Sequence, residues 1–549
     1  MQRKPNLRPH SNSLVAAFLL LSAAISIVLL AVRNLSDDEI SSLNTITSPV
    51  ASILRLIAVT DAHPPGMYLL GHFAFRILPS FRWMNLFSAA VLYAGLAVFL
   101  LQVTPLLART GSRIVLLLLA TLHPQLLMWS VTYRWYGWWT GLALIALTVA
   151  LQPLRPRPAF SLARAVLLGV LLAGLFYLNF ITFLFAFALP AAMLLRYRTE
   201  PRTKLAASAF TTTAIFLALA APQFPAMIAI HLPYGQSQRS GILNSTLHLI
   251  QSIAASEAYL PWHPLAIAAD LLLAALCLCG LLALLRRLRS PRISATSAGA
   301  FAPILLFSLL FFVLVAASGL GGRPRNGLLL VVVLAPAAAL ITDTLNQRTQ
   351  SAILIFFACW SSVGIAHLAG RYGLSKASMI SRPEQVVAFV HQTSGTNCSV
   401  IITYEPMLAF TVTQANLPHT VVVSPFHEPV LGGSHDLPES DCTHAYLYTV
   451  QSYLADGDDA KQAVQQQLQS ATHFIDGPPR TDSFSFDPDA ARKRTLARIP
   501  GLASAATLPD YRYVVISGPI DPARISPMRQ AMPDYSSGHI TVKDSPLKP

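Results

Sequence analysis

The sequence predicts an all-α polytopic membrane protein that carries a C-terminal α/β domain. Of the 549 residues, 54% are hydrophobic and only 12% are charged, and the mean hydropathy is +0.52. Soluble domains carry about 25% charged residues, so this balance is typical of an integral membrane protein. The apolar runs have the length of membrane-spanning helices and lack the alternation of a membrane barrel. After Gly370 the composition becomes polar, which indicates a domain boundary there.

The apolar runs predict about eleven membrane-spanning helices, within a range of about ten to thirteen, because a lipid-exposed backbone must satisfy its own hydrogen bonds. The first run follows Arg3, Lys4 and Arg8 as a signal peptide would, but no small-residue cleavage site stands out after it. It is therefore interpreted as a retained first helix. The predicted spans cover residues 14–32, 83–103, 114–131, 137–151, 165–178, 180–195, 205–230, 264–285, 301–318, 328–344 and 351–369.

The basic residues indicate how these helices are oriented. With the N-terminus inside, the inner loops hold clusters of Arg and Lys, and the outer segments hold scattered arginines, as the positive-inside rule requires. The net charge of +14 therefore does not indicate a nucleic-acid partner. The segment from Pro64 to Pro79 is short and contains His72 and Arg76, so it is predicted to be an interfacial helix. The inner clusters are Arg109 and Arg113; Arg155, Arg157 and Arg164; Arg196, Arg198, Arg202 and Lys204; Arg286, Arg287, Arg289 and Arg292; and Arg348.

Residues 1–370 thus form the membrane domain, and residues 371–549 are predicted to form an extracytoplasmic α/β domain, because an odd number of spans leaves this end outside. Helix-like and strand-like patterns alternate there, and the proline-rich C-terminal end is expected to be irregular. Cys398 and Cys442 each start a strand-like run; they form a disulfide if the domain faces an oxidising compartment, or remain thiols. The predicted helices are residues 383–393, 406–415 and 460–470, and the predicted strands are residues 399–404, 419–423, 445–450 and 513–517.

An acidic cluster, Asp37-Asp38-Glu39, follows the first span on the predicted outer side. Carboxylates beside a membrane are costly to desolvate, so they either sit in water or have a function. Ser36 and Glu39 have the spacing of a capping box, and acidic residues suit the first turn of a helix. Alternatively, one carboxylate is a general base that activates an acceptor, or a ligand of a divalent cation. Both interpretations stand.

A second candidate segment is Asp61-Ala62-His63-Pro64-Pro65-Gly66-Met67-Tyr68. Its plain interpretation is a turn with proline at the start of a helix and a solvated histidine. The functional interpretation places His63 at a helix start on the membrane surface. There the imidazole binds a phosphate or a metal, or relays a proton.

Aromatic residues dominate the stretch from Tyr133 to Trp139, at the outer end of the third predicted span. Such residues usually form a belt at the membrane interface, and that interpretation is favoured for Tyr136 and its neighbours. Arg134 is the one residue of this stretch for which a phosphate contact is the alternative.

Two further outer turns carry polar residues. Asn179, two residues after Tyr177, interrupts an apolar run and satisfies backbone groups at a turn. Arg323 and Arg325 precede the tenth span on the sparsely basic outer side. They snorkel to the interface, or they clamp a lipid-linked phosphate, for which the guanidinium fork is well suited.

The order of these motifs is more specific than any one of them. The motifs are the acidic pair, the His63-Pro64-Pro65 segment ending in Tyr68, Arg82 at the start of the next span, Arg134 with Tyr136, Tyr177 with Asn179, and Arg323 with Arg325 before a run that ends in Ala335-Pro336. Over residues 10–370 this order resembles the GT-C membrane glycosyltransferases. It is most similar to their RgtA/B/C/D-like branch, which is related to protein mannosyltransferases and the aminoarabinose transferase of lipid A.

The resemblance implies transfer of a hexose or pentose from a polyprenyl-phosphate donor to a lipid, polysaccharide or protein acceptor on the outer side. Asp38 matches the family's acidic catalytic position, with Asp37 or Glu39 in support, and direct attack by the activated acceptor would invert the anomeric centre. His63 falls where relatives hold Lys or His near the donor phosphate. Asn179 stands where relatives often hold His, so the resemblance does not carry a metal ligand over to this position. A divalent cation bound elsewhere stays an alternative to a metal-free enzyme. The resemblance implies no other cofactor. The other residues assigned to substrate binding are Tyr68, Arg82, Arg134, Tyr136, Tyr177, Asn179, Arg323 and Arg325.

Two other functions stay open from the residues alone. A transporter or flippase for lipid-linked sugars also needs many spans, but it usually shows repeat symmetry and polar residues at mid-membrane. A receptor that binds ligand through its C-terminal domain leaves the acidic cluster and His63 unexplained. The ionisable residues of the candidate motifs lie at the outer surface rather than at mid-membrane, which favours an enzyme. The expected location is a bacterial plasma membrane rather than an endoplasmic reticulum.

Overall fold

The computed structural model divides the chain into two compact units. The bundle unit comprises Met1–Val32, Ala62–Met67 and Ser80–Ala369, and the second unit comprises Arg33–Asp61, Tyr68–Pro79 and Gly370–Pro549. The residues that the structure describes are 10–32, 39, 42–43, 45–46, 49–59, 63–78, 81–155, 160–228, 241–254, 263–288, 297–322, 324–369, 383–395, 397–403, 408, 420–423, 444–454, 475–486 and 511–524.

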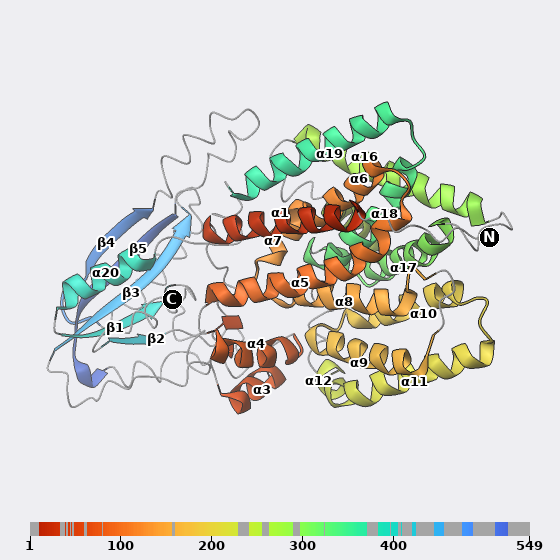
Figure 1. Ribbon diagram of the computed structural model, residues 1–549. Coiled ribbons are helices and arrows are strands. Elements are labelled where there is room, and N and C mark those ends of the chain that lie inside the picture. The colour runs from red at the N-terminus through yellow and green to blue at the C-terminus, as the bar shows by residue number, and fades with distance from the viewer. Residues whose placement is uncertain are drawn as a thin grey trace. The chain divides into compact units, whose positions relative to one another are not determined.

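The bundle unit consists of helices (Figure 1). Its longer helices are α1 (His10–Val32), α5 (Phe81–Val103), α6 (Thr110–Thr121), α7 (Pro124–Ser130), α8 (Trp135–Leu151), α9 (Leu162–Leu178), α10 (Thr182–Arg196), α11 (Arg202–Ala220), α14 (Ile242–Ala254), α16 (His263–Leu288), α17 (Ser297–Ala317), α18 (Leu328–Thr342) and α19 (Gln347–His367). Two single-turn 3-10 helices, η5 (Leu320–Gly322) and η6 (Pro324–Gly327), link α17 to α18.

Each predicted span coincides with one of these helices or with a pair of them. Among the described residues, seven helices are long and apolar enough to cross a membrane; α6 and α7, bent by 44° at their junction, make an eighth if they act as one span. Helices α8, α9 and α10 are shorter apolar helices. The all-α membrane class is therefore confirmed, and the number of spans stays a prediction.

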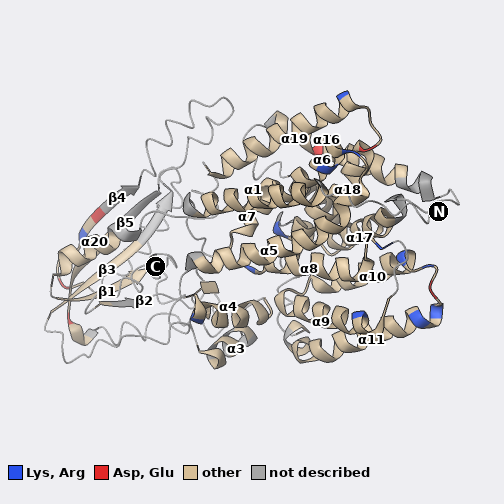
Figure 2. Ribbon diagram, in the orientation of Figure 1, with Lys and Arg blue, Asp and Glu red and all other residues tan. Residues whose placement is uncertain are grey.

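The basic residues of the bundle lie at helix ends. Figure 2 shows Lys and Arg at the ends of α10 and α11 that flank their connecting loop, while the middles of these helices carry no charge. This loop region holds Arg196, Arg198, Arg202 and Lys204. The arrangement fits the positive-inside pattern, and the side of the membrane stays a prediction.

Helices α5 and α8 pack closely through two glycines. A Cβ atom on Gly141 would collide with the Val91 carbonyl oxygen and lie 2.9 Å from the Leu92 Cα, and one on Gly95 would collide with the Gly141 backbone. Small residues at a helix contact let two backbones approach, which is a common way to pack helices in lipid.

Gly141→Ala is therefore expected to destabilise the bundle by about 1–3 kcal/mol, because the added methyl group forces α5 and α8 apart. Gly174→Ala on α9 is the matched control, since a Cβ there meets nothing within 4 Å. Thermal unfolding of the two purified variants checks this. A melting temperature of Gly141→Ala equal to that of the control would show that the close packing is not needed.

The break between α6 and α7 follows from Leu122-His123-Pro124. Proline is the first residue of α7 and has no N–H to donate, so the helix of α6 stops before it. His123 caps the new helix, because its Nδ1 accepts a hydrogen bond from the Gln125 N–H at 3.2 Å. The bend thus has a local cause in the sequence.

The second unit contains helix α3 (Val50–Val59) and most of helix α4 (Gly66–Ile77). The 12 residues of α4 are too few to span a membrane, in agreement with the predicted short helix of residues 64–79. His72 is buried on α4, and its Nδ1 lies 2.8 Å from the Ile46 carbonyl oxygen.

The C-terminal part of the second unit is a five-stranded sheet in the order β2-β1-β3-β5-β4. Strand β1 runs parallel to β2 and β3, whereas β5 is antiparallel to both β3 and β4. Helix α20 (Pro383–Ser394) buries Val386 and Val390 in a core with Ile401, Val450 and Val515. The strands are β1 (Cys398–Thr403), β2 (Thr420–Val423), β3 (Ala445–Leu454), β4 (Arg480–Phe486) and β5 (Tyr511–Ile520).

This sheet confirms the predicted α/β fold, with one strand missed. Strand β4 was not predicted because its sequence, Arg-Thr-Asp-Ser-Phe-Ser-Phe, is mostly polar. A polar strand suits the edge of the sheet, where β4 lies. The predicted helices 406–415, apart from the buried Leu408, and 460–470 lie outside the described residues. Cys398 is disulfide-bonded, Cys442 lies outside the described residues, and Cys277, Cys279 and Cys359 are free thiols.

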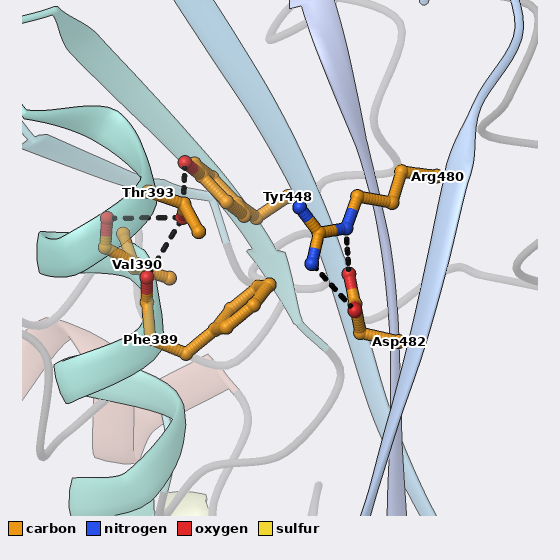
Figure 3. Close-up of polar contacts among 6 residues, drawn as sticks. All are labelled: Phe389, Val390, Thr393, Tyr448, Arg480 and Asp482. Atoms are coloured by element: carbon orange, nitrogen blue, oxygen red, sulfur yellow. Dashed lines mark hydrogen bonds and ion pairs between the residues drawn. The ribbon is translucent and has the colours of Figure 1, made fainter.

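Side-chain contacts connect α20 to the sheet (Figure 3). The Thr393 and Tyr448 hydroxyls lie 2.9 Å apart. The Arg480 guanidinium pairs with Asp482 at 2.8 Å and lies 5.8 Å from the centre of the Phe389 ring. Arg480 is exposed, so this ion pair contributes little stability, and the contacts fix the position of β4 rather than suggest a site.

Candidate functional site

The segment around His63 packs against the start of α8 and the end of α9. His63 is half-buried, and its ring centre lies 6.4 Å from that of Trp135. A Cβ on Gly66 would lie 2.5 Å from the Tyr177 carbonyl oxygen, so only glycine allows this approach. The Tyr133 hydroxyl donates to the Met67 carbonyl oxygen at 3.4 Å. The motif containing His63 is thus held in place by residues that are distant in the sequence.

The aromatic residues at the start of α8 are buried inside the protein. Trp135 is 4% exposed and Tyr136 is 1% exposed, and their ring centres lie 4.3 Å apart in an edge-to-face contact. Trp129 also contacts Tyr136, with ring centres 4.7 Å apart. The prediction of an interfacial belt is therefore wrong for these residues, because protein rather than lipid surrounds them.

Arg325 reaches this aromatic group from η6. Its guanidinium carbon lies 5.3 Å from the centre of the Tyr136 ring, within the range of a cation–π interaction. His63, Trp135, Tyr136 and Arg325 therefore form one group, which we call the His63–Arg325 cluster. It brings together a guanidinium, an imidazole and two aromatic rings from three segments that are far apart in the sequence.

A second guanidinium lies next to the cluster in the chain. Arg134 is only 7% exposed and directly precedes Trp135. Burial raises the pKa of the Tyr133 phenol, and the Arg134 charge opposes this rise, so the phenol stays neutral. Guanidinium groups at a partly buried site are suited to phosphate, which they bind through paired N–H donors.

Asn179 has a structural role at the turn between α9 and α10, and Tyr177 joins α9 to α11. The Asn179 Oδ1 accepts from the Ile181 N–H at 2.8 Å, as predicted for a residue that satisfies backbone groups. The Tyr177 hydroxyl donates to the Leu219 carbonyl oxygen at 3.0 Å. In the part of the chain that the structure describes, no three His, Cys, Asp or Glu side chains are grouped as a metal site.

In the part of the chain that the structure describes, the remaining predicted site residues do not belong to the His63–Arg325 cluster. Asp37, Asp38 and Arg323 lie outside the described residues, and Arg82 belongs to α5 without a described side chain. Glu39 and Tyr68 belong to the second unit, where they are 0% and 1% exposed. The burial of Glu39 suits a supporting role better than contact with a substrate.

Two residues of the bundle were not singled out from the sequence. Trp135 stands between Arg134 and Tyr136, and nothing in the pattern shows that its ring contacts His63. The sequence did contain a signal for His123, because an ionisable residue within an apolar run is unusual. It is buried at the α6–α7 break.

Comparison with a solved structure shows that the chain has the GT-C fold. The structure that establishes this is ArnT from Cupriavidus metallidurans bound to undecaprenyl phosphate. It is 13% identical, the match covers 92% of this chain and 98% of that chain, and the TM-score is 0.50. A match to the Archaeoglobus fulgidus oligosaccharyltransferase tethered with an acceptor peptide has 12% identity, covers 84% of this chain and 70% of that chain, and has a TM-score of 0.44. No family model and no curated protein matches the chain.

Proposed function

We propose that the chain is a membrane glycosyltransferase that moves a sugar from a polyprenyl-phosphate donor to an acceptor on the outer face of the membrane. The observation that carries this is the His63–Arg325 cluster, in which Arg325 lies over Tyr136 while Trp135 contacts His63. The cluster occurs in a fold shared with a protein solved with undecaprenyl phosphate. A cationic group beside aromatic rings suits a phosphate attached to a long apolar chain.

The chemistry needs one base and a few cations. Asp38 removes the proton from the acceptor hydroxyl or amine as the acceptor attacks the anomeric carbon. The bond from that carbon to the phosphate oxygen breaks, and polyprenyl phosphate leaves with one more negative charge. Because the attack is direct, the anomeric centre inverts. Asp37 and the buried Glu39 support the orientation of Asp38.

The cations stabilise the phosphate as it leaves. Arg325, Arg323 and Arg134 bind its oxygens, and His63, three residues before the start of α4, assists them. Charge on the departing oxygen is larger in the transition state than in the bound donor, so cations placed there accelerate the reaction. The further assigned binding residues are Tyr68, Arg82, Tyr136, Tyr177 and Asn179. The last two act indirectly, because the Tyr177 side chain binds a backbone group of α11 and the Asn179 side chain binds one in the α9–α10 turn.

The acceptor is a lipid, a polysaccharide or a protein, and the enzyme lies in a bacterial plasma membrane with the C-terminal domain outside. The disulfide-bonded Cys398 supports an oxidising compartment for that domain. The alternative to activation of the acceptor by Asp38 alone is a divalent cation bound at the acidic cluster. Sugar transfer that continues in the presence of a strong chelator would exclude this cation.

The test is reconstitution of the full chain in vesicles with a labelled polyprenyl-phosphate sugar and a cell-envelope fraction as the acceptor source. The proposal expects a labelled covalent product together with free polyprenyl phosphate. Movement of intact donor across the vesicle membrane without product would instead identify a flippase. A product with the anomeric configuration of the donor would contradict direct attack.

A further inference from the structure

His123 uses both of its ring nitrogens at the α6–α7 break. Its Nδ1 accepts from the Gln125 N–H, so the proton of the neutral ring is on Nε2. Nε2 then donates to the Ile253 carbonyl oxygen at 2.6 Å. The side chain is 1% exposed, and no part of the proposed reaction uses it.

Trp360 on α19 makes the adjacent contact. Its indole N–H donates to the Ala254 carbonyl oxygen at 3.1 Å, and its ring meets that of His123 edge-to-face with centres 5.0 Å apart. Ile253 and Ala254 are the last residues of α14. The final carbonyl groups of a helix have no partner within it, so His123 and Trp360 cap the C-terminus of α14.

Helix α14 in turn holds the segment that carries Arg325. The Gly321 N–H donates to the Ser245 Oγ at 2.9 Å, and a Cβ on Gly321 would collide with the Ser245 backbone. A Cβ on Gly327 would lie 3.1 Å from the Leu249 Cδ1. Both ends of η5–η6 are therefore packed on α14, and Arg325 projects from between them over Tyr136.

We propose that His123 is a positioning residue for Arg325: by capping α14 it fixes the helix on which η5–η6 rests, and so holds the guanidinium over Tyr136. The inference rests on the proposed function, because it takes Arg325 as a contact of the donor phosphate. A hydrophobic residue at position 123 would fill the space but would leave the Ile253 carbonyl oxygen without its donor.

Hydrogen exchange of the full-length protein tests the positioning itself. His123→Phe and Trp360→Phe keep a ring but lose the donor, so amide exchange in residues 242–254 and 320–327 should rise about five- to tenfold. His123→Gln keeps an N–H donor and should restore slow exchange. Ser361→Ala is the matched control, because Ser361 donates to Leu122 at the same break and not to α14. Unchanged exchange in His123→Phe would overturn the proposal.

Transfer kinetics test the link to Arg325. His123→Phe should divide its effect between kcat and KM as Arg325→Gln does, and the double variant should be no worse than Arg325→Gln alone. Fully additive losses, or loosened exchange with unchanged transfer, would overturn a role through Arg325. If the unmodified protein transfers no sugar, the proposed function fails, and the exchange measurement still decides whether His123 positions η5–η6.

Discussion

Asp38→Asn is expected to lower the rate of sugar transfer about 10²–10⁴-fold, the usual contribution of a general base. The carboxamide has nearly the same shape as the carboxylate but does not accept the acceptor's proton. The loss should fall on kcat, because the donor phosphate is bound elsewhere. Initial rates with labelled polyprenyl-phosphate sugar at saturating donor measure it directly.

Asp37→Asn is the control for Asp38→Asn, since it removes the same charge from the next residue. Its effect is expected to be smaller, because Asp37 only supports the orientation of its neighbour. Unchanged transfer by Asp38→Asn would remove Asp38 from the mechanism. Equal losses of transfer rate in the two variants would mean that the total negative charge of the cluster matters, and that Asp38 is not the one general base.

Arg325→Gln is expected to reduce transfer about 10²–10³-fold, the size of effect seen when one donor to a developing negative charge is removed. Arg325→Lys should recover only part of this loss. The ammonium group keeps the charge but lacks the planar fork that binds phosphate oxygens in pairs, and it stacks less well on Tyr136. The measurements are kcat and KM for the lipid donor and the thermal shift caused by polyprenyl phosphate.

The matched control for Arg325 is Arg348→Gln, which removes an exposed arginine from the start of α19. It should change neither the kinetics nor the thermal shift. An Arg325→Gln variant that retains full transfer and full stabilisation by polyprenyl phosphate would show that the cation–π contact is a packing feature only.

Much of the fold was predictable because lipid imposes a simple rule on sequence. A span must be a long apolar run, so the helices of the predicted spans could be located without any knowledge of their packing, whereas α3 and α14 were not predicted. The composition change after Gly370 likewise predicted the sheet domain. Strand β4 escaped because an exposed edge strand needs little apolar character, and its Asp and Ser residues gave no strand signal.

The candidate site was predictable only in part. Inside a membrane domain, apolar and aromatic residues cover both buried and lipid-facing surfaces, so composition does not distinguish a belt from a core. For that reason Trp135 and Tyr136 were assigned to the interface although they are buried. The contact of Arg325 with Tyr136 joins segments far apart in the chain, and no local spacing encodes it. The roles of Asp37 and Asp38 stay predictions, since both lie outside the described residues.

The central claim is that the His63–Arg325 cluster holds a lipid-linked phosphate, and photo-crosslinking tests it most directly. The probe is a polyprenyl phosphate with a diazirine in the isoprene unit next to the phosphate, added to membranes that contain the full chain. Labelled peptides should map to residues 63–67, 129–139 and 320–327, and unlabelled polyprenyl phosphate should compete, whereas the polyprenol without phosphate should not. Labelling confined to other segments, or equal competition by the polyprenol, would contradict the account.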